Sequence, residues 1–161
     1  MEIIKGNLIK LAVSGEAKII VHGCNCFHAM GSGIAGLLAK QFPEIPLADY
    51  QTDRGDVSKL ATYSRAHVTK MFSPLTKLSG NTCVPLENPF TCINLYTQYV
   101  PGPDFLPSLF SEGLRRLNKD FKGETLWFPL IGCGIGGGDW ADVMNDMLVH
   151  LRDVDVRVVV L

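Results

Sequence analysis

The sequence has little charge and no long apolar run, and these absences exclude several classes of protein. Charged residues make up 19% of the 161 residues, and the formal net charge is −1. A chain this close to neutral offers no basic surface for nucleic acid or for an acidic membrane. No apolar stretch approaches the roughly 20 residues of a membrane-spanning helix, and residues 1–6 resemble a short charged strand rather than a signal peptide. We therefore expect a cytoplasmic protein with neither a membrane nor a nucleic-acid partner.

The cysteines fit neither a disulfide framework nor a zinc site. Their number is odd, no pair has the spacing of zinc ligands, and the closest pair forms C-x-C rather than the C-x-x-C of thioredoxin-like proteins, so reduced thiols are expected. No cluster of His, Asp and Glu has the spacing of metal ligands. We expect neither a metal nor a cofactor. The five cysteines are Cys24, Cys26, Cys83, Cys92 and Cys133.

Apolar runs typical of strands alternate along the chain with segments of helical periodicity. Hydrophobic residues make up 47% of the sequence, which is enough for the core of one monomeric domain over residues 1–161. The alternation predicts an α/β fold with a largely parallel sheet covered on both faces. Residues 6–11 are expected to form a turn and a connection, and residues 71–88 a loop or small hairpin. Strands are expected at 2–5, 18–21, 59–68, 90–98, 125–128 and 155–161, and helices at 33–42, 44–52, 104–118 and 139–152.

The stretch with the most chemistry reads VHGCNCFHAMGSGIA and spans residues 21–35. An apolar strand leads into a loop, and the loop opens a helix with an apolar face. Gly23, Gly31 and Gly33 let backbone N–H groups approach a ligand, and the helix N-terminus behind them favours negative charge. Taken alone, this pattern fits a phosphate-binding loop and a simple tight turn equally well.

A second loop of the same kind follows the strand at 125–128. It reads GCGIGGG over residues 132–138 and opens the last helix. Ligands of open α/β sheets bind beyond the carboxyl ends of such strands, so two such loops can clamp a diphosphate from both sides. The sequence has no P-loop motif, and only one helix and one strand follow the G-x-G-x-x-G match, which disfavours a dinucleotide-binding unit. The repetition favours ligand binding over turn geometry alone.

These motifs resemble the macro domain family. The resemblance rests on GNL at 6–8, HGCN at 22–25, GSGIA at 31–35 and LIGCGIGG at 130–137, and it covers essentially the whole chain. It implies a three-layer α/β/α sandwich with a mixed, largely parallel central sheet, and binding of ADP-ribose or a related metabolite. More narrowly, the first loop is similar to the branch that contains ADP-ribose-1″-phosphate phosphatases and terminal ADP-ribose protein glycohydrolases.

The resemblance also implies a set of ligand-binding residues. The two glycine loops would donate backbone N–H groups to the diphosphate and the distal ribose. Asn25 would hydrogen-bond the ribose hydroxyls, the alternative being a turn-forming role. Asn7 stands where many macro domains have an aspartate that accepts from the adenine amino group. The expected set is Asn7, Leu8, Cys24, Asn25, Met30, Gly31, Ser32, Gly33, Ile34, Ala35, Gly132, Cys133, Gly134, Ile135, Gly136 and Gly137.

Two positions depart from the pattern of the glycohydrolases. Gln98 and Gly136 stand where those enzymes have a lysine and an aspartate, which argues against a mechanism through a lysine adduct. The expected catalytic residues are instead His22, Asn25 and His28, with His22 donating a proton or orienting water near neutral pH. The alternative for His28 is an exposed loop histidine.

Three functions follow from these observations. The leading hypothesis is a hydrolase that binds ADP-ribose and dephosphorylates ADP-ribose-1″-phosphate. The second is a non-catalytic module that binds ADP-ribose or a related nucleotide, which the departures at Gln98 and Gly136 support. The third is a deacylase or glycohydrolase of ADP-ribosyl esters. Cys24 and Cys133 fit small buried residues better than nucleophiles, and Asp139 fits the N-cap of the last helix better than a general base.

Overall fold

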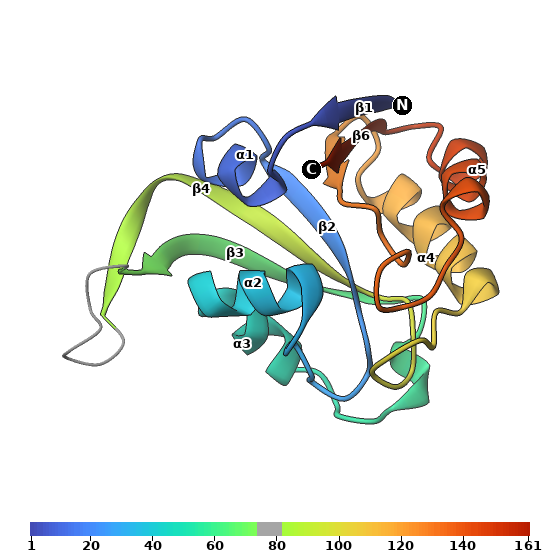
Figure 1. Cartoon of the computed structure of the whole chain (residues 1–161), viewed down its shortest axis with the longest axis horizontal. Coiled ribbons are helices and arrows are strands. Elements are labelled where there is room, and N and C mark those ends of the chain that lie inside the picture. The colour runs from blue at the N-terminus through green and yellow to red at the C-terminus, as the bar shows by residue number, and fades with distance from the viewer. Residues whose placement is uncertain (74–81) are drawn as a thin grey trace.

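The computed structural model describes residues 1–73 and 82–161, and within them the chain builds one six-stranded sheet (Figure 1). The strand order is β1-β6-β5-β2-β4-β3. Neighbouring strands pair in parallel except β3 and β4, which are antiparallel. The predicted mixed, largely parallel sheet is confirmed. The strands are β1 (Glu2–Lys5), β2 (Ile19–Cys24), β3 (Tyr63–Phe72), β4 (Cys83–Tyr96), β5 (Thr125–Phe128) and β6 (Asp155–Val160).

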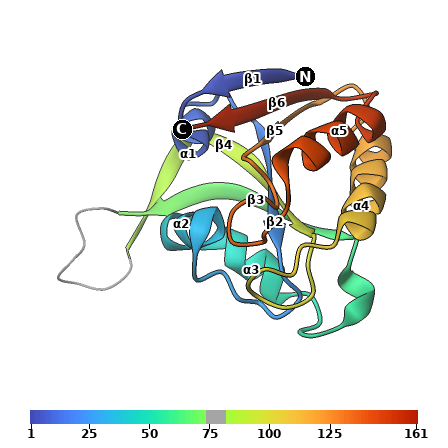
Figure 2. The ribbon, with the colours of Figure 1, turned by 45° about the vertical axis from the view of Figure 1, so that its right-hand side comes forward.

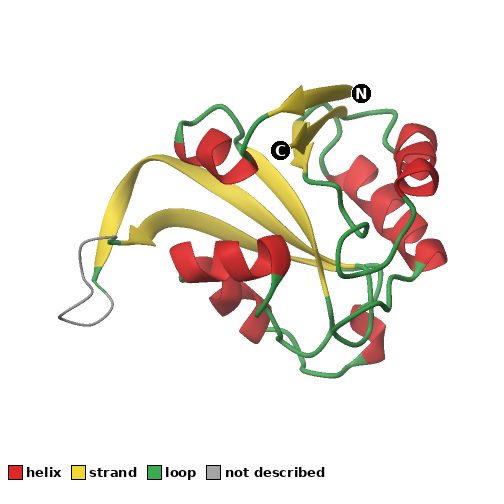
Figure 3. Ribbon diagram, in the orientation of Figure 1, coloured by secondary structure: helices red, strands yellow, loops and turns green. Residues whose placement is uncertain are grey.

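Helices cover both faces of the sheet, which confirms the three-layer sandwich (Figure 3). Neighbouring residues of a strand point to opposite faces, so Val21 packs in the core under α4 and α5, whereas Ile20 packs in the core under α1, α2 and α3. In the described ranges, no helix has the length and apolar character needed to cross a membrane. The helices are α1 (Leu8–Val13), α2 (Gly33–Gln41), α3 (Glu44–Tyr50), α4 (Pro107–Asp120) and α5 (Trp140–His150), with a 3-10 turn at Val57–Lys59.

The segment after β1 is a helix, so the predicted turn and connection over residues 6–11 is wrong. Asn7 is the N-cap of α1, and its Oδ1 accepts a hydrogen bond from Lys10 N at 3.0 Å. Such a cap satisfies an N–H group that the first turn leaves without a partner. The helix has only six residues, too few for a clear helical period in the sequence.

The segment 71–88 is largely strand in its described part, where β3 and β4 form a long antiparallel hairpin. Residues 74–81 lie outside the described residues, so the loop expected there is not tested. Pro85 and Pro89 are tolerated because this part of β4 pairs with β3 alone, and the parallel pairing with β2 begins at Thr91. A strand with one open side can accommodate residues that lack an N–H donor.

The fourth helix begins at Pro107, not at Asp104 as predicted. Proline fits the first helical position because that N–H has no intrahelical partner anyway. The Asp104 carboxylate instead accepts hydrogen bonds from the N–H groups of Tyr99 and Val100, both at 3.0 Å. Asp104 therefore fixes the loop that follows β4.

A carboxylate at the start of α3 holds an irregularity in β3. The strand register shifts between Val68 and Lys70. Glu44 accepts from Thr69 N at 2.8 Å, from Thr69 Oγ1 at 2.9 Å and from Lys70 N at 3.1 Å. The bulge would otherwise leave these N–H donors without a protein partner.

We predict that Glu44→Ala lowers the free energy of unfolding by about 1–3 kcal/mol, because three hydrogen bonds to a charged acceptor are lost. Urea denaturation measures the change. The matched control is Glu112→Ala on the exposed face of α4, which should change stability by less than about 0.5 kcal/mol. Equal effects of the two substitutions would contradict the role of Glu44.

Candidate functional site

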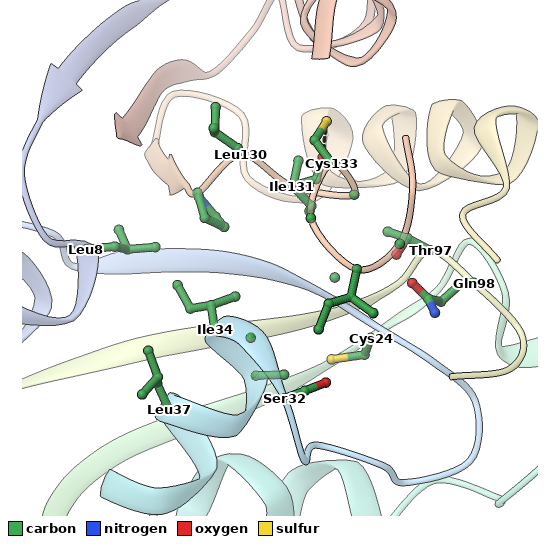
Figure 4. Close-up of a pocket in the computed structure, with 18 of the residues that line it drawn as sticks. Leu8, Cys24, Ser32, Ile34, Leu37, Thr97, Gln98, Leu130, Ile131 and Cys133 are labelled. Carbon is green, nitrogen blue, oxygen red and sulfur yellow. Dashed lines mark hydrogen bonds between the residues drawn. The ribbon is translucent and has the colours of Figure 1, made fainter. Parts of the chain in front are cut away.

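A cleft of about 900 Å³ runs along the carboxyl ends of the parallel strands (Figure 4). Its lining includes the segments that follow β1, β5, β2 and β4, together with the end of β6. Parallel neighbours end at the same edge of the sheet. Segments far apart in the sequence therefore meet there. Figure 4 shows Leu8 toward one end of the cleft and Thr97 and Gln98 toward the other.

The first wall of the cleft is the N-terminus of α2. Gly31, Ser32, Gly33, Ile34 and Ala35 all line it. The first turn of a helix has N–H groups without intrahelical acceptors and carries a partial positive charge. The side chain of the N-cap Ser32 makes no capping hydrogen bond. The wall thus offers main-chain donors that an anion can use.

The second wall is the loop between β5 and α5. Its shape depends on Gly132, which has a φ of +74° and whose absent Cβ would lie 2.5 Å from Phe105 Cε2. The loop is closed by a hydrogen bond from Gly138 N to Gly132 O at 2.7 Å. Within residues 1–73 and 82–161, the N–H groups of residues 134–136 have no acceptor. The second wall therefore presents further unused donors.

The two walls approach each other across the cleft. Ile135 Cδ1 of the second loop lies 3.9 Å from the position that a Cβ of Gly33 would take at the start of α2. Exposed apolar side chains, among them Leu37 and Leu130, form the rest of the rim. No described lining residue has an Asp, Glu, His, Lys or Arg side chain. The described lining thus has no charged side chain and is mostly apolar, with main-chain donors on both sides.

Most of the residues predicted as ligand-binding line this one cleft. Four residues of the prediction lie outside it: Met30, Gly137, His22 and His28. Met30 packs against the cores under α2 and the first loop. The predicted residues that line the cleft are Asn7, Leu8, Cys24, Asn25, Gly31, Ser32, Gly33, Ile34, Ala35, Gly132, Cys133, Gly134, Ile135 and Gly136.

The Asn25 carboxamide is occupied by its own loop. Its Oδ1 accepts from Phe27 N at 2.9 Å and from Ala29 N at 3.4 Å, and its Nδ2 donates to Ala29 O at 2.8 Å. The side chain is 8% exposed. This is the turn-forming role that the sequence left as the alternative, and it shapes the loop at the cleft.

His22 lies inside the molecule rather than in the cleft. Its side chain is fully buried on the α2 and α3 side of the sheet. Asn94 Nδ2 donates to Ile45 O and Ser64 Oγ, so the Asn94 Oδ1 faces His22 and accepts from its Nε2 at 2.6 Å. Burial lowers the pKa of His22 below its ordinary value of 6.5. A neutral imidazole that donates to Asn94 is held away from any ligand in the cleft.

His28 is held by contacts to α3 and the residues after it, and burial keeps the thiols of Cys24 and Cys133 protonated. His28 Nε2 donates to Thr52 O at 2.8 Å, and the ring packs edge-on against Tyr50. Burial raises the pKa of the Cys24 thiol well above its ordinary value and also raises the pKa of the Cys133 thiol. Protonated thiols are poor nucleophiles. Asp139 caps α5 by accepting from Asp142 N at 3.1 Å.

Thr97 was not predicted as a site residue, and Gln98 entered only as a departure from a family pattern. Both line the cleft next to Gly23 and Cys24. The Gln98 Oε1 lies 3.1 Å from the position of an absent Cβ at Gly136. The two positions that depart from the glycohydrolase pattern thus face each other. The sequence contains a signal that could have identified them as site residues, because Thr97 and Gln98 are polar residues directly after a buried strand.

The comparison with curated proteins gives a close relative. An uncharacterized 17.5 kDa protein from the tk–vs intergenic region of Enterobacteria phage T4 is 41% identical over 150 residues, which span 90% of this chain and 85% of the phage protein. The chain belongs to the family of this phage protein. No model of a known protein family matches the chain.

Comparison with solved structures shows which fold this chain has. The macrodomain of Thermus aquaticus DarG superposes with a TM-score of 0.72 and 21% identity, over 99% of this chain and 97% of that one. Thermosipho africanus DarTG, solved in complex with ADP-ribose, superposes with a TM-score of 0.68 and 16% identity, over 99% of this chain and 41% of DarTG. This chain therefore has the macrodomain fold.

We predict that folding stability falls as the pH drops below about 6.5, because the unfolded chain binds a proton at His22 that the folded chain excludes. The slope attributable to one proton is at most about 1.4 kcal/mol per pH unit. Denaturant titrations between pH 7.5 and pH 5.5 measure it. His22→Gln should flatten the pH dependence, whereas His67→Gln, at an exposed position of β3, should leave it unchanged. A wild-type pH dependence in His22→Gln would contradict the assignment.

Proposed function

We propose that this protein binds ADP-ribose, or a nucleotide of the same build, in the cleft between α2 and the β5–α5 loop. The observation that carries the proposal is the pair of opposed main-chain donor groups, one at the first turn of α2 and one at residues 134–136. Opposed N–H groups around a gap suit a diphosphate, which spreads negative charge over several oxygens. No described side chain of the cleft wall carries a negative charge that would compete with the diphosphate.

The shape of the cleft suits a base at one end and a sugar at the other. The end near β1 and β6 is lined by apolar side chains, including Leu8, Ile9 and Val159. The end near β2 and β4 carries the polar side chains of Thr97 and Gln98. A flat apolar base gains from burial against aliphatic groups, and a sugar needs hydrogen-bond partners. We place adenine near Leu8 and the distal ribose near Gln98.

The solved macrodomains support this reading of the fold. DarTG from Thermosipho africanus was solved in complex with ADP-ribose, and 41% of its chain superposes on this fold. The Asn7 Oδ1, which caps α1 through Lys10 N, keeps a second lone pair that can accept from the adenine amino group. An amide acceptor there carries no charge, so the contact should be weaker than one made by a carboxylate.

Binding without catalysis fits the cleft better than hydrolysis. General acid and base groups must reach the reacting atoms, and no described lining side chain is an acid, a base or an ionised thiol. Dephosphorylation of ADP-ribose-1″-phosphate is the second candidate. It is favoured by the continuation of the cleft past β2 to Gly102, which leaves space beyond the sugar. In that reaction, water would attack the phosphate without assistance from the His22 imidazole.

We predict that ADP-ribose binds to the wild type in isothermal titration calorimetry and that Ser32→Glu weakens binding by about tenfold or more, because a carboxylate at the start of α2 repels the diphosphate. The substitution introduces an acidic N-cap, which is compatible with the helix. Gln51→Glu adds the same charge at the exposed end of α3 and should bind like the wild type. Absence of ADP-ribose binding to the wild type would contradict the proposed function.

We predict that the wild type releases no phosphate from ADP-ribose-1″-phosphate above the uncatalysed rate. Malachite green detection with purified protein measures this, and O-acetyl-ADP-ribose and an ADP-ribosylated peptide test the ester deacylase and glycohydrolase alternatives. Sustained turnover of any of these substrates would replace the binding function by an enzymatic one. The His22→Ala variant would then show whether the histidine takes part.

A further inference from the structure

Thr97 places an unpaired hydroxyl at the floor of the cleft. The residue follows β4, and its main chain is fixed because Thr97 N donates to Cys24 O at 3.1 Å and Thr97 O accepts from Leu106 N at 3.0 Å. The residue is 1% exposed, and within the described parts of the chain its Oγ1 has no hydrogen-bond partner. A buried polar atom without a partner costs free energy, so such an atom usually has a purpose.

The hydroxyl has room only because residue 23 is a glycine. A Cβ at Gly23 would lie 2.8 Å from Thr97 Oγ1 and 3.5 Å from Ile131 Cγ1. All three residues line the cleft. The hydroxyl therefore lies between β2 and the start of the second loop, just beneath the surface of the cleft.

Gln98 adds an acceptor of fixed direction beside this hydroxyl. Its Nε2 donates to Val100 O and to Gly102 O, both at 2.8 Å. Two carbonyl acceptors require the NH₂ group on that side, so the orientation of the carboxamide is decided. The Oε1 then points toward Gly136 of the second loop, where an absent Cβ would lie 3.1 Å from it. Gln98 can accept a hydrogen bond from a ligand but has no free N–H to donate.

We propose that Thr97 and Gln98 form a hydroxyl-recognition site that makes the cleft prefer an unmodified distal sugar over one that carries a phosphate. The inference rests on the proposed function. A sugar hydroxyl can donate to Gln98 Oε1 and accept from the Thr97 hydroxyl. A phosphate dianion can use only the second contact, and the Gln98 oxygen repels it. No described side chain of the lining supplies a cation to offset this repulsion.

The test is calorimetry with ADP, ADP-ribose and ADP-ribose-1″-phosphate. The wild type should bind ADP-ribose more tightly than ADP-ribose-1″-phosphate. Thr97→Val, which keeps the shape and removes the hydroxyl, should weaken ADP-ribose binding by about three- to tenfold and leave ADP binding unchanged. Thr91→Val, on the same strand and outside the cleft, is the matched control and should bind all three ligands like the wild type.

Two substitutions at Gln98 separate charge from shape. Gln98→Met removes the acceptor without adding charge and should lose several-fold in ADP-ribose affinity. Gln98→Lys puts a cation at the same place and should shift the preference toward ADP-ribose-1″-phosphate by about tenfold relative to Gln98→Met. Circular dichroism and thermal melting confirm that each variant is folded.

The outcomes distinguish this inference from the function on which it rests. If the wild type binds ADP-ribose but both Thr97→Val and Gln98→Met bind it equally well, the recognition site is refuted and the proposed function stands. A wild type that binds ADP-ribose-1″-phosphate as tightly as ADP-ribose also refutes it. If the wild type binds ADP as tightly as ADP-ribose, the polar end of the cleft adds no affinity for the distal ribose, and the recognition site is refuted. Failure to bind any of the three ligands overturns both proposals.

Discussion

The parallel pairing of β2 with its neighbours β5 and β4 is the constraint on which the site depends. Parallel strands end at one edge, so the segments after these three strands meet although they are far apart in the sequence. The helix after β2 lies on one face of the sheet, and the helices after β4 and β5 lie on the other (Figure 2). The chain must therefore separate at this edge, and the opening between α2 and the β5–α5 loop is the cleft.

The lack of charge in the cleft decides what it can do. An anion bound there is balanced by N–H dipoles rather than by lysine or arginine, so main-chain geometry, more than net charge, sets affinity. No described side chain of the lining is an Asp, Glu, His, Lys or Arg, the residue types that most often act in acid–base catalysis. His22 and Cys24, at the end of β2, are kept uncharged by burial.

A buried polar network supports the first loop from behind. Tyr96 Oη donates to Asp49 Oδ1 at 2.7 Å and lies 2.9 Å from Ser64 Oγ, which also accepts from the Asn94 amide. The Lys59 ammonium lies 4.6 Å from the centre of the Tyr96 ring. These contacts join the sheet to α3, and Lys59 Nζ also donates to Cys26 O at 3.4 Å in the first loop. A buried polar network whose members all have hydrogen-bond partners favours a single conformation. Here the network supports one conformation of the loop at the cleft.

The sequence by itself determined the type of most elements and the two glycine loops, because hydrophobic period and glycine position are local properties. It missed α1, and the three-layer sandwich followed from the resemblance to macro domains. It predicted most of the residues that meet in the cleft, since strand ends in a parallel sheet share an edge. It could not predict the orientation of the polar side chains or their hydrogen-bond partners. His22 and Asn25 looked chemically active, yet Asn94 and the loop N–H groups take up their polar atoms. Thr97 looked ordinary, yet tertiary packing leaves its hydroxyl unpaired. Hydrogen-bond partners belong to the fold, and only the tertiary structure decided them.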